Sequence, residues 1–206
     1  MDVYSNFAEL SETETEDLDF CVSAVKRKGS NVVIVAPHGG AIEPGTSEVA
    51  KKVAANDFSL VLFEGTKSKG NRRLHITSTN FDERRCVELA QKSDVVVAIH
   101  GEGSAGVSVF LGGRDDELGA RLRTALERYG YAVKTHRNPA LQGLHKANIC
   151  NRGRSGAGVQ LELSLGLRKT FFESLTEKGR KKPTKELARF AAAVREGLHT
   201  SGRFKA

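Results

Sequence analysis

The sequence contains no hydrophobic run close to the roughly 20 residues that a membrane-spanning helix requires. Its first residues, Met1 to Asn6, include neither the basic cluster nor the apolar segment of a signal peptide. We therefore expect a protein that is made in the cytoplasm without a signal peptide and that has no membrane partner. Action outside the producing cell would then require another route, such as release by lysis.

Cysteine is scarce, and no two cysteines form a Cys-x-x-Cys pair. The three residues, Cys21, Cys86 and Cys150, are widely spaced, which argues against a zinc cluster built from thiolates. A chain of 206 residues buries roughly 70% of its unfolded surface, so it needs no disulfides to fold. The cysteines are expected to be reduced and structural, with Cys150 as a weaker candidate for a nucleophile.

The chain also lacks internal repeats, low-complexity segments and the glycine patterns of nucleotide-binding loops. Its net charge of +7 and pI near 9.4 nevertheless indicate an anionic partner. The positive charge is scattered, and its one dense run, Lys178 to Lys182, equally fits a solvated linker. A polyanionic substrate explains the charge, and nucleic acid is not the expected partner.

Short apolar runs alternate with amphipathic segments along the whole chain. The predicted strands lie at 20–25, 32–36, 58–63, 74–77, 95–99, 107–111, 131–133 and 159–165, and the predicted helices at 46–56, 83–92, 116–129 and 183–199. This alternation predicts one α/β domain over residues 1–206, with three α/β/α layers around a central mixed, mostly parallel sheet. Residues 1–17 are acidic and polar, and we expect either a short ordered segment or a loose end.

Two of the predicted strands end in a histidine that is followed by glycine. The run Val32 to Ala36 stops at Pro37 and leads to His38 and Glu43, and a second run leads to His100. The carboxyl ends of parallel strands meet at one edge of an α/β sheet, where ligands bind. Two imidazoles and one carboxylate are a ligand set suited to zinc, so His38, Glu43 and His100 are the predicted metal ligands.

A hydrolytic metal site also needs a base beside the water that it activates. Glu162 is the leading candidate, since it leaves the polar face of a late, strictly alternating strand. Glu102 and Glu64 are rivals for this role. Glu64 is also predicted, together with His75, to support the metal ligands from behind.

Cationic and amide side chains near this edge would hold substrate carboxylates and stabilise an oxyanion. Arg152 is the predicted catalytic arginine. The predicted substrate-binding residues are Arg73, Arg85, Asn148 and Arg168.

Several stretches resemble the poly-γ-glutamate hydrolases of Bacillus phages and related bacterial sequences. They follow the same order as in that family and cover nearly all of the chain after residue 15. The stretches are 36–46 (APHGGAIEPGT), 74–83 (LHITSTNFDE), 99–101 (IHG), 148–153 (NICNRG) and 159–164 (VQLELS).

The resemblance implies a zinc-dependent, metallocarboxypeptidase-like fold and hydrolysis of the γ-amide bonds of poly-γ-glutamate, a bacterial capsule and biofilm polymer. It places Glu162 in the Leu-Glu-Leu setting of the carboxypeptidase base. His38 and Glu43 are five positions apart (43 − 38), where carboxypeptidases have His-x-x-Glu. Arg84 and Arg85 also stand where a proline and a less basic run are expected.

Three functions follow from these observations. The first is a monomeric zinc hydrolase of poly-γ-glutamate. The second is a related zinc deacylase that acts on small N-acyl acidic amino acids. The third is a non-catalytic protein that binds anions or nucleic acid through its basic surface.

Overall fold

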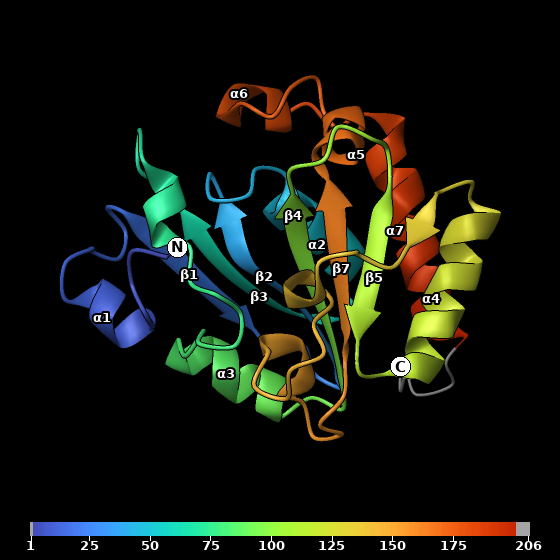
Figure 1. Ribbon diagram of the computed structural model, residues 1–206, viewed down its shortest axis with the longest axis horizontal. Coiled ribbons are helices and arrows are strands. Elements are labelled where there is room, and N and C mark those ends of the chain that lie inside the picture. Colours follow the sequence, from blue (N-terminus) through green and yellow to red (C-terminus); the bar gives the residue numbers. More distant parts are fainter. Residues whose placement is uncertain (1, 201–206) are drawn as a thin grey trace.

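The computed structural model describes residues 2–200, which form a central sheet with helices on both faces (Figure 1). The strands are β1 (Phe20–Val25), β2 (Val32–Gly40), β3 (Ser59–Gly65), β4 (Val95–Glu102), β5 (Val109–Gly113), β6 (Val133–Lys134) and β7 (Val159–Ser164). The α-helices are α1 (Phe7–Ser11), α2 (Thr46–Ala54), α3 (Arg84–Gln91), α4 (Asp116–Arg128), α5 (Leu165–Thr170), α6 (Glu177–Arg180) and α7 (Lys185–His199). Three short 3₁₀ helices are η1 (Asn71–Leu74), η2 (Pro139–Leu141) and η3 (Ile149–Asn151).

The sheet has seven strands in the order β1-β3-β2-β4-β7-β5-β6. Strands β3, β2, β4 and β7 run parallel, β1 and β5 pair antiparallel with their inner neighbours, and β6 pairs parallel with β5. The prediction of a mixed, mostly parallel sheet in an α/β domain is therefore confirmed. The carboxyl ends of the four parallel strands lie together, so the residues that follow them share one edge.

Two hydrophobic cores sandwich the sheet, because buried strands place successive side chains on opposite faces. On one face, β-strand residues such as Ile34, Val97 and Leu161 pack with α2, α4 and α7. On the other face, the neighbouring residues Val35 and Ala98 pack with α1, α3 and η3. This second face is the one on which His100 and Glu162 emerge.

Strand β2 differs from its prediction, since it continues through Pro37 to Gly40 instead of stopping there. Its pairing with β3 shifts between Ala36 and Gly39, which is a β-bulge. Pro37 lies inside the bulge, where its missing N–H costs no ladder hydrogen bond.

The other elements start and end close to the predicted positions. The main exception is 74–77, where the structure has the end of η1 and a loop instead of a short strand. Helix α2 follows Gly45, and the N-cap of α3 is Glu83, whose carboxylate accepts from the Cys86 N–H at 2.8 Å.

The N-terminal segment packs against the rest of the domain. Leu10 of α1 is fully buried, and the hydroxyl of Tyr4 donates to Glu14 at 2.7 Å. A second anchor joins the segment to the loop before α3, where the backbone N–H of Phe7 donates to Asp82 at 2.5 Å. Residues 2–17 are thus part of the domain rather than a loose end.

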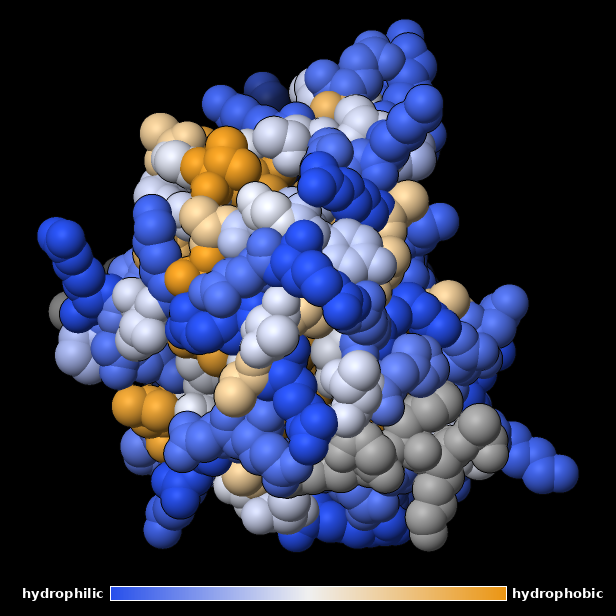
Figure 2. Space-filling model, turned by 90° about the vertical axis from the view of Figure 1, so that its right-hand side faces the viewer, coloured by the Kyte–Doolittle hydropathy of each residue, from blue (hydrophilic) through white to orange (hydrophobic). Residues whose placement is uncertain are grey.

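No helix within residues 2–200 is long and apolar enough to cross a membrane. The face seen in Figure 2 is mostly hydrophilic, with small separate hydrophobic patches. Exposed large apolar side chains are scattered along the sequence, at positions such as Val3, Leu18 and Val107. Single exposed apolar residues of this kind are normal on soluble domains and do not mark a binding surface.

Candidate active site

The register of the sheet brings two of the predicted site residues together. Strands β4 and β7 pair in parallel with His100 directly opposite Glu162. Both side chains leave the sheet on the same face and are buried. A strand spacing of roughly 4.8 Å therefore separates a candidate ligand from a candidate base.

The bulge in β2 brings His38 to that same face. Simple alternation from Ile34 and Ala36 would turn His38 toward α2. Instead, Gly39 faces α2 so closely that a Cβ atom there would lie 2.1 Å from the Ser47 hydroxyl oxygen. The glycine is therefore required, and its neighbour His38 points to the opposite side, toward His100.

The loop after β2 then returns Glu43 to the end of the strand. The backbone N–H of Glu43 donates to the carbonyl of His38 at 2.9 Å, and the hydroxyl of Thr46 donates to the carbonyl of Glu43 at 2.9 Å. The N–H of Gly101 donates to Glu43 Oε2 at 2.8 Å. Three elements thus fix the carboxylate beside the two histidines.

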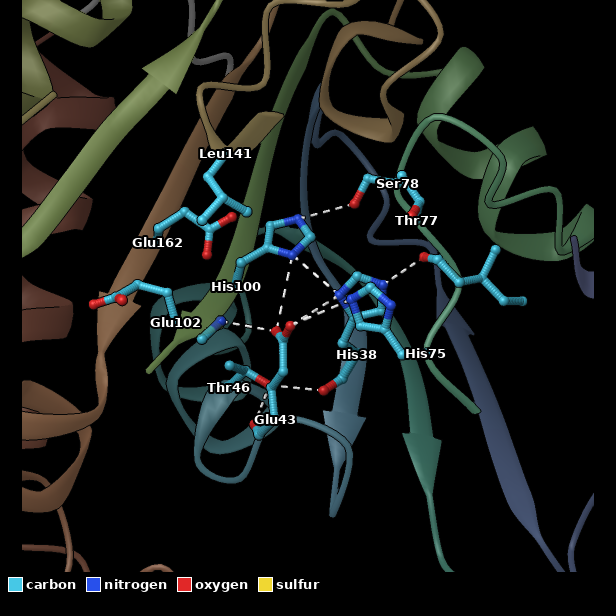
Figure 3. A network of polar contacts seen from close by, with 12 residues as sticks. His38, Glu43, Thr46, His75, Thr77, Ser78, His100, Glu102, Leu141 and Glu162 are labelled. Atoms are coloured by element: carbon cyan, nitrogen blue, oxygen red, sulfur yellow. Dashed lines mark hydrogen bonds and ion pairs between the residues drawn. The ribbon is translucent and has the colours of Figure 1, made fainter. Parts of the chain in front are cut away.

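Ring nitrogens and carboxylate oxygens face one another in this cluster (Figure 3). His38 Nδ1 lies 3.2 Å from Glu43 Oε1 and 3.2 Å from His100 Nδ1. His100 Nδ1 lies 3.8 Å from Glu43 Oε2. His75 was predicted to lie behind the ligands. Its Nε2 lies 3.8 Å from Glu43 Oε1, the same oxygen that faces His38.

The outer nitrogen of each imidazole has its own partner. His38 Nε2 lies 2.7 Å from the carbonyl of Ile76, and His100 Nε2 lies 3.4 Å from the hydroxyl of Ser78. His75 Nδ1 lies 2.7 Å from Asp2 Oδ1. A carbonyl only accepts, so Nε2 of His38 carries a proton, and Nδ1 is the ring nitrogen that faces Glu43.

Burial and neighbouring charges shift the pKa values of His75, His100 and Glu43. Burial, together with the charge of His38, lowers the pKa of His75 to about 4 and that of His100 to about 3. Burial alone would raise the pKa of Glu43, but His38, His100 and the N–H of Gly101 hold it well below its usual range. Neutral imidazoles and an ionised carboxylate are the protonation states that metal ligands need.

Glu162 has the opposite tendency. Burial, reinforced by the charges of Glu43 and Glu102, raises its pKa well above the usual range. Its Oε1 accepts a hydrogen bond from Gln160 Nε2 at 2.9 Å, and the Gln160 oxygen accepts one from Asn148 at 2.9 Å. A buried carboxylate whose pKa is raised in this way is typical of a catalytic acid or base.

These residues line a cleft of about 540 Å³. Its floor includes His38, Glu43, His75, His100 and Glu162, so the cleft contains every predicted metal ligand and the predicted base. The predicted substrate-binding residue Asn148 also lines it. The residues that sequence reasoning missed are Arg72, Thr77, Ser78, Thr79, His136, Ala140, Leu141 and Gln160.

The four predicted arginines do not reach the cleft. The guanidinium of Arg152 donates to the carbonyls of Ala147, Phe81 and Thr79, and that of Arg168 to the carbonyls of Leu163, Pro44 and Glu102. These two side chains therefore brace the loops around the site. Arg85 pairs with Glu16 and Glu83, and Arg73 contacts Tyr4 and Glu14.

The rival carboxylates have other partners as well. Glu64 forms an ion pair with Lys51 at 3.1 Å, and the Ile76 carbonyl takes the place next to His38 that was predicted for Glu64. Glu102 borders the cleft, but its carboxylate accepts from the backbone and hydroxyl of Ser104. Cys150 is fully buried and its pKa is raised by burial to about 12, which does not suit a nucleophile.

Comparison with known proteins identifies the family to which this site belongs. Residues 4–193 match the family model described as poly-gamma-glutamate hydrolase. The chain belongs to the poly-gamma-glutamate hydrolase family. It is therefore a hydrolase, and the resemblance seen in the sequence motifs is confirmed.

Relatives in this family share both sequence and fold with the chain. The UPF0714 protein YmaC of Bacillus subtilis (strain 168) is 41% identical over 181 residues, which cover 87% of this chain and 76% of YmaC. A solved bacteriophage poly-gamma-glutamate hydrolase is 32% identical with a TM-score of 0.94, covering 98% of this chain and 99% of that chain. A zinc-free apo structure of YndL is 36% identical with a TM-score of 0.91, covering 98% and 99%.

Proposed function

We propose that this hydrolase cleaves the γ-glutamyl amide bonds of poly-γ-glutamate and that its cofactor is a zinc ion. The observation that carries the proposal is the convergence of His38, Glu43 and His100 beside Glu162 in one cleft. The family supplies the substrate class, and the zinc-free structure of YndL supports the choice of metal.

The residues in the cleft fit a zinc ion. The Ile76 carbonyl binds Nε2 of His38, so the neutral ring turns the lone pair of Nδ1 toward Glu43 Oε1, 3.2 Å away, and one cation would bind both atoms. Imidazole and carboxylate are the ligands common in catalytic zinc sites, which leave one position for water or substrate.

The third ligand is either His100 or His75, because both approach Glu43. The ligating atoms of His38, Glu43 and His75 all lie within 4.8 Å of one another. However, His75 is stacked on His38, with ring centroids 4.0 Å apart and an interplanar angle of 29°, so their in-plane lone pairs run side by side. The rings of His38 and His100 meet at 61°, which suits two ligands of one ion. We therefore propose His38, Glu43 and His100 as the ligands.

When bound, zinc would polarise the amide carbonyl and lower the pKa of water. Glu162, on the strand next to that of His100, would accept a proton from the attacking water. It would then deliver that proton to the departing amine nitrogen as the carbon–nitrogen bond breaks. Gln160 holds one oxygen of Glu162 and thereby aims the other into the cleft.

Substrate carboxylates require a cation at the edge of the cleft. Arg72 lines the cleft and is exposed, and its guanidinium has no hydrogen bond or ion pair within residues 2–200. We therefore assign to Arg72 the substrate-binding role that the sequence suggested for Arg73, Arg85 and Arg168. An arginine binds a carboxylate through two parallel hydrogen bonds.

The direct test is digestion of purified poly-γ-glutamate, with chain length followed by gel electrophoresis. We expect shortening that is lost after treatment with a chelator and restored by one equivalent of zinc. The matched control is Glu162→Gln, which should bind zinc without shortening the polymer. Intact polymer combined with hydrolysis of small N-acylglutamates would instead establish the deacylase alternative.

Because poly-γ-glutamate is a capsule and biofilm polymer, we propose that the enzyme meets its substrate outside the producing cell, as a monomer released by lysis. Sedimentation of the purified chain tests the monomer. Degradation of capsules on intact cells by added enzyme tests the site of action.

A further inference from the structure

Asp2 is joined to the active site although it lies far from it in the sequence. Its Oδ2 accepts hydrogen bonds from the backbone N–H and the hydroxyl of Thr77, each at 2.6 Å. Its Oδ1 lies 2.7 Å from His75 Nδ1. The three contacts use both carboxylate oxygens and fix the Asp2 side chain in one orientation.

The segment that carries Asp2 is held in place by other contacts. Tyr4 donates to Glu14, and the N–H of Phe7 donates to Asp82. Asp2 is therefore presented to His75 by a packed segment, and the order of this segment does not depend on the Asp2 contact alone.

His75 links Asp2 to the proposed zinc ligands. Its ring stacks on His38, with centroids 4.0 Å apart, and its Nε2 lies 3.8 Å from Glu43 Oε1. Asp2 accepts a hydrogen bond from the Nδ1–H of His75. This bond holds the ring against His38, with its other nitrogen toward Glu43. Rotation of His75 would remove both of these supports at once.

We propose that Asp2 is a positioning residue of the metal site, acting through His75 to hold His38 and Glu43 in their ligating orientations. This inference rests on the proposed zinc site. The proposed zinc ligands come from the ends of the strands, and the N-terminal segment would support them through Asp2.

Zinc affinity of the full chain, measured by competition with a chromophoric chelator, tests the proposal. We expect Asp2→Ala to raise the zinc dissociation constant about tenfold, the lower end of the roughly 10- to 100-fold loss seen when a direct partner of a metal ligand is removed, because Asp2 acts through His75. The control is Asp82→Ala, which removes the acceptor of the Phe7 N–H, another anchor of the same segment, without touching His75 and should leave the constant unchanged. Asp2→Asn provides a second variant if Asp2→Ala fails to fold.

A double-mutant cycle separates action through His75 from a general loosening of the segment. His75→Phe keeps an aromatic ring against His38 but lacks the nitrogen that bonds to Asp2. Adding Asp2→Ala to His75→Phe should then cost no further affinity. Wild-type affinity in Asp2→Ala, an equal loss in Asp82→Ala, or additive losses in the double variant would each overturn the proposal. A wild-type chain that binds no zinc would instead overturn the proposed function.

Discussion

His100 and Glu162 occupy directly opposed positions on the neighbouring parallel strands β4 and β7. Their side chains leave the sheet on the same face, so strand pairing alone sets their separation. A proposed ligand and a proposed base on two central strands are held more rigidly than residues on loops. The pairing also explains how one site uses residues 62 positions apart in the sequence (162 − 100).

Replacement of Glu162 by glutamine should abolish catalysis without loss of zinc. Glutamine keeps the size and can still accept the hydrogen bond from Gln160, but it accepts no proton from water. We expect kcat to fall by about 10²–10⁴-fold, the usual contribution of a general base. Polymer cleavage and zinc content should be measured on the same preparation. Glu102→Gln is the matched control, and full activity in Glu162→Gln would place the base elsewhere.

The same substitution should stabilise the metal-free protein in a pH-dependent way. Burial and the charges of Glu43 and Glu102 raise the folded-state pKa of Glu162 above its unfolded value of about 4.5. Below that unfolded value the Glu162 carboxyl is protonated in both the folded and the unfolded state, so it does not lower the free energy of unfolding. As the pH rises through the raised folded pKa, the wild type must bury a charge and loses stability.

Thermal unfolding of chelator-treated wild type and Glu162→Gln tests this expectation. The two melting temperatures should be similar near pH 4 and should diverge by pH 8, with the variant more stable. Each kcal/mol of difference corresponds to about 2–4 °C for a chain of this size. A difference that does not change with pH would show that the carboxylate is not buried as a charge.

The sheet and the places of His38, His100 and Glu162 at its edge were predictable because their signals are local. Buried strands read as uninterrupted apolar runs, and the edge at which parallel strands end is fixed by topology. The strict alternation around Glu162 likewise identified the face on which it emerges. For His100 and Glu162, the position along a predicted strand is enough to give the face and the edge of the sheet on which the side chain lies.

Other parts of the site depend on contacts that leave no mark in the sequence. The bulge that turns His38 away from α2 depends on the approach of Ser47 to Gly39. The catalytic and substrate-binding arginines were predicted from residue type alone. Arg152 and Arg168 instead donate hydrogen bonds to backbone carbonyls that only the folded loops bring together. Asp2 and Arg72 gave no sequence signal, since an isolated charged residue is most often on the surface.

Zinc content should distinguish the roles of the two histidines that approach Glu43. His100→Ala removes a proposed ligand and should leave far less than one zinc per chain after dialysis. His75→Ala removes only a supporting ring and should retain one zinc at saturating metal, with weaker affinity. Elemental analysis measures both, and the exposed His145→Ala serves as the control. The reverse pattern would make His75 the third ligand.

Arg72 and Arg73 provide a matched pair for testing substrate recognition. Arg72 lines the cleft without a partner among residues 2–200, whereas Arg73 contacts Tyr4 at 3.2 Å and Glu14 at 3.4 Å. Arg72→Gln should raise KM for poly-γ-glutamate about tenfold, since a hydrogen bond to a charged group contributes about 1.5 kcal/mol. Its kcat should change little.

Arg73→Gln should leave KM unchanged and have little effect on the free energy of unfolding, because the Arg73 side chain is exposed and the buried Glu14 keeps its contacts with Lys67 and Tyr4. Steady-state kinetics at low and moderate salt measures both variants, and the KM effect of Arg72→Gln should shrink as salt screens the attraction. Equal KM changes in the two variants would show that the substrate responds to overall charge. In that case Arg72 would have no specific place in the cleft.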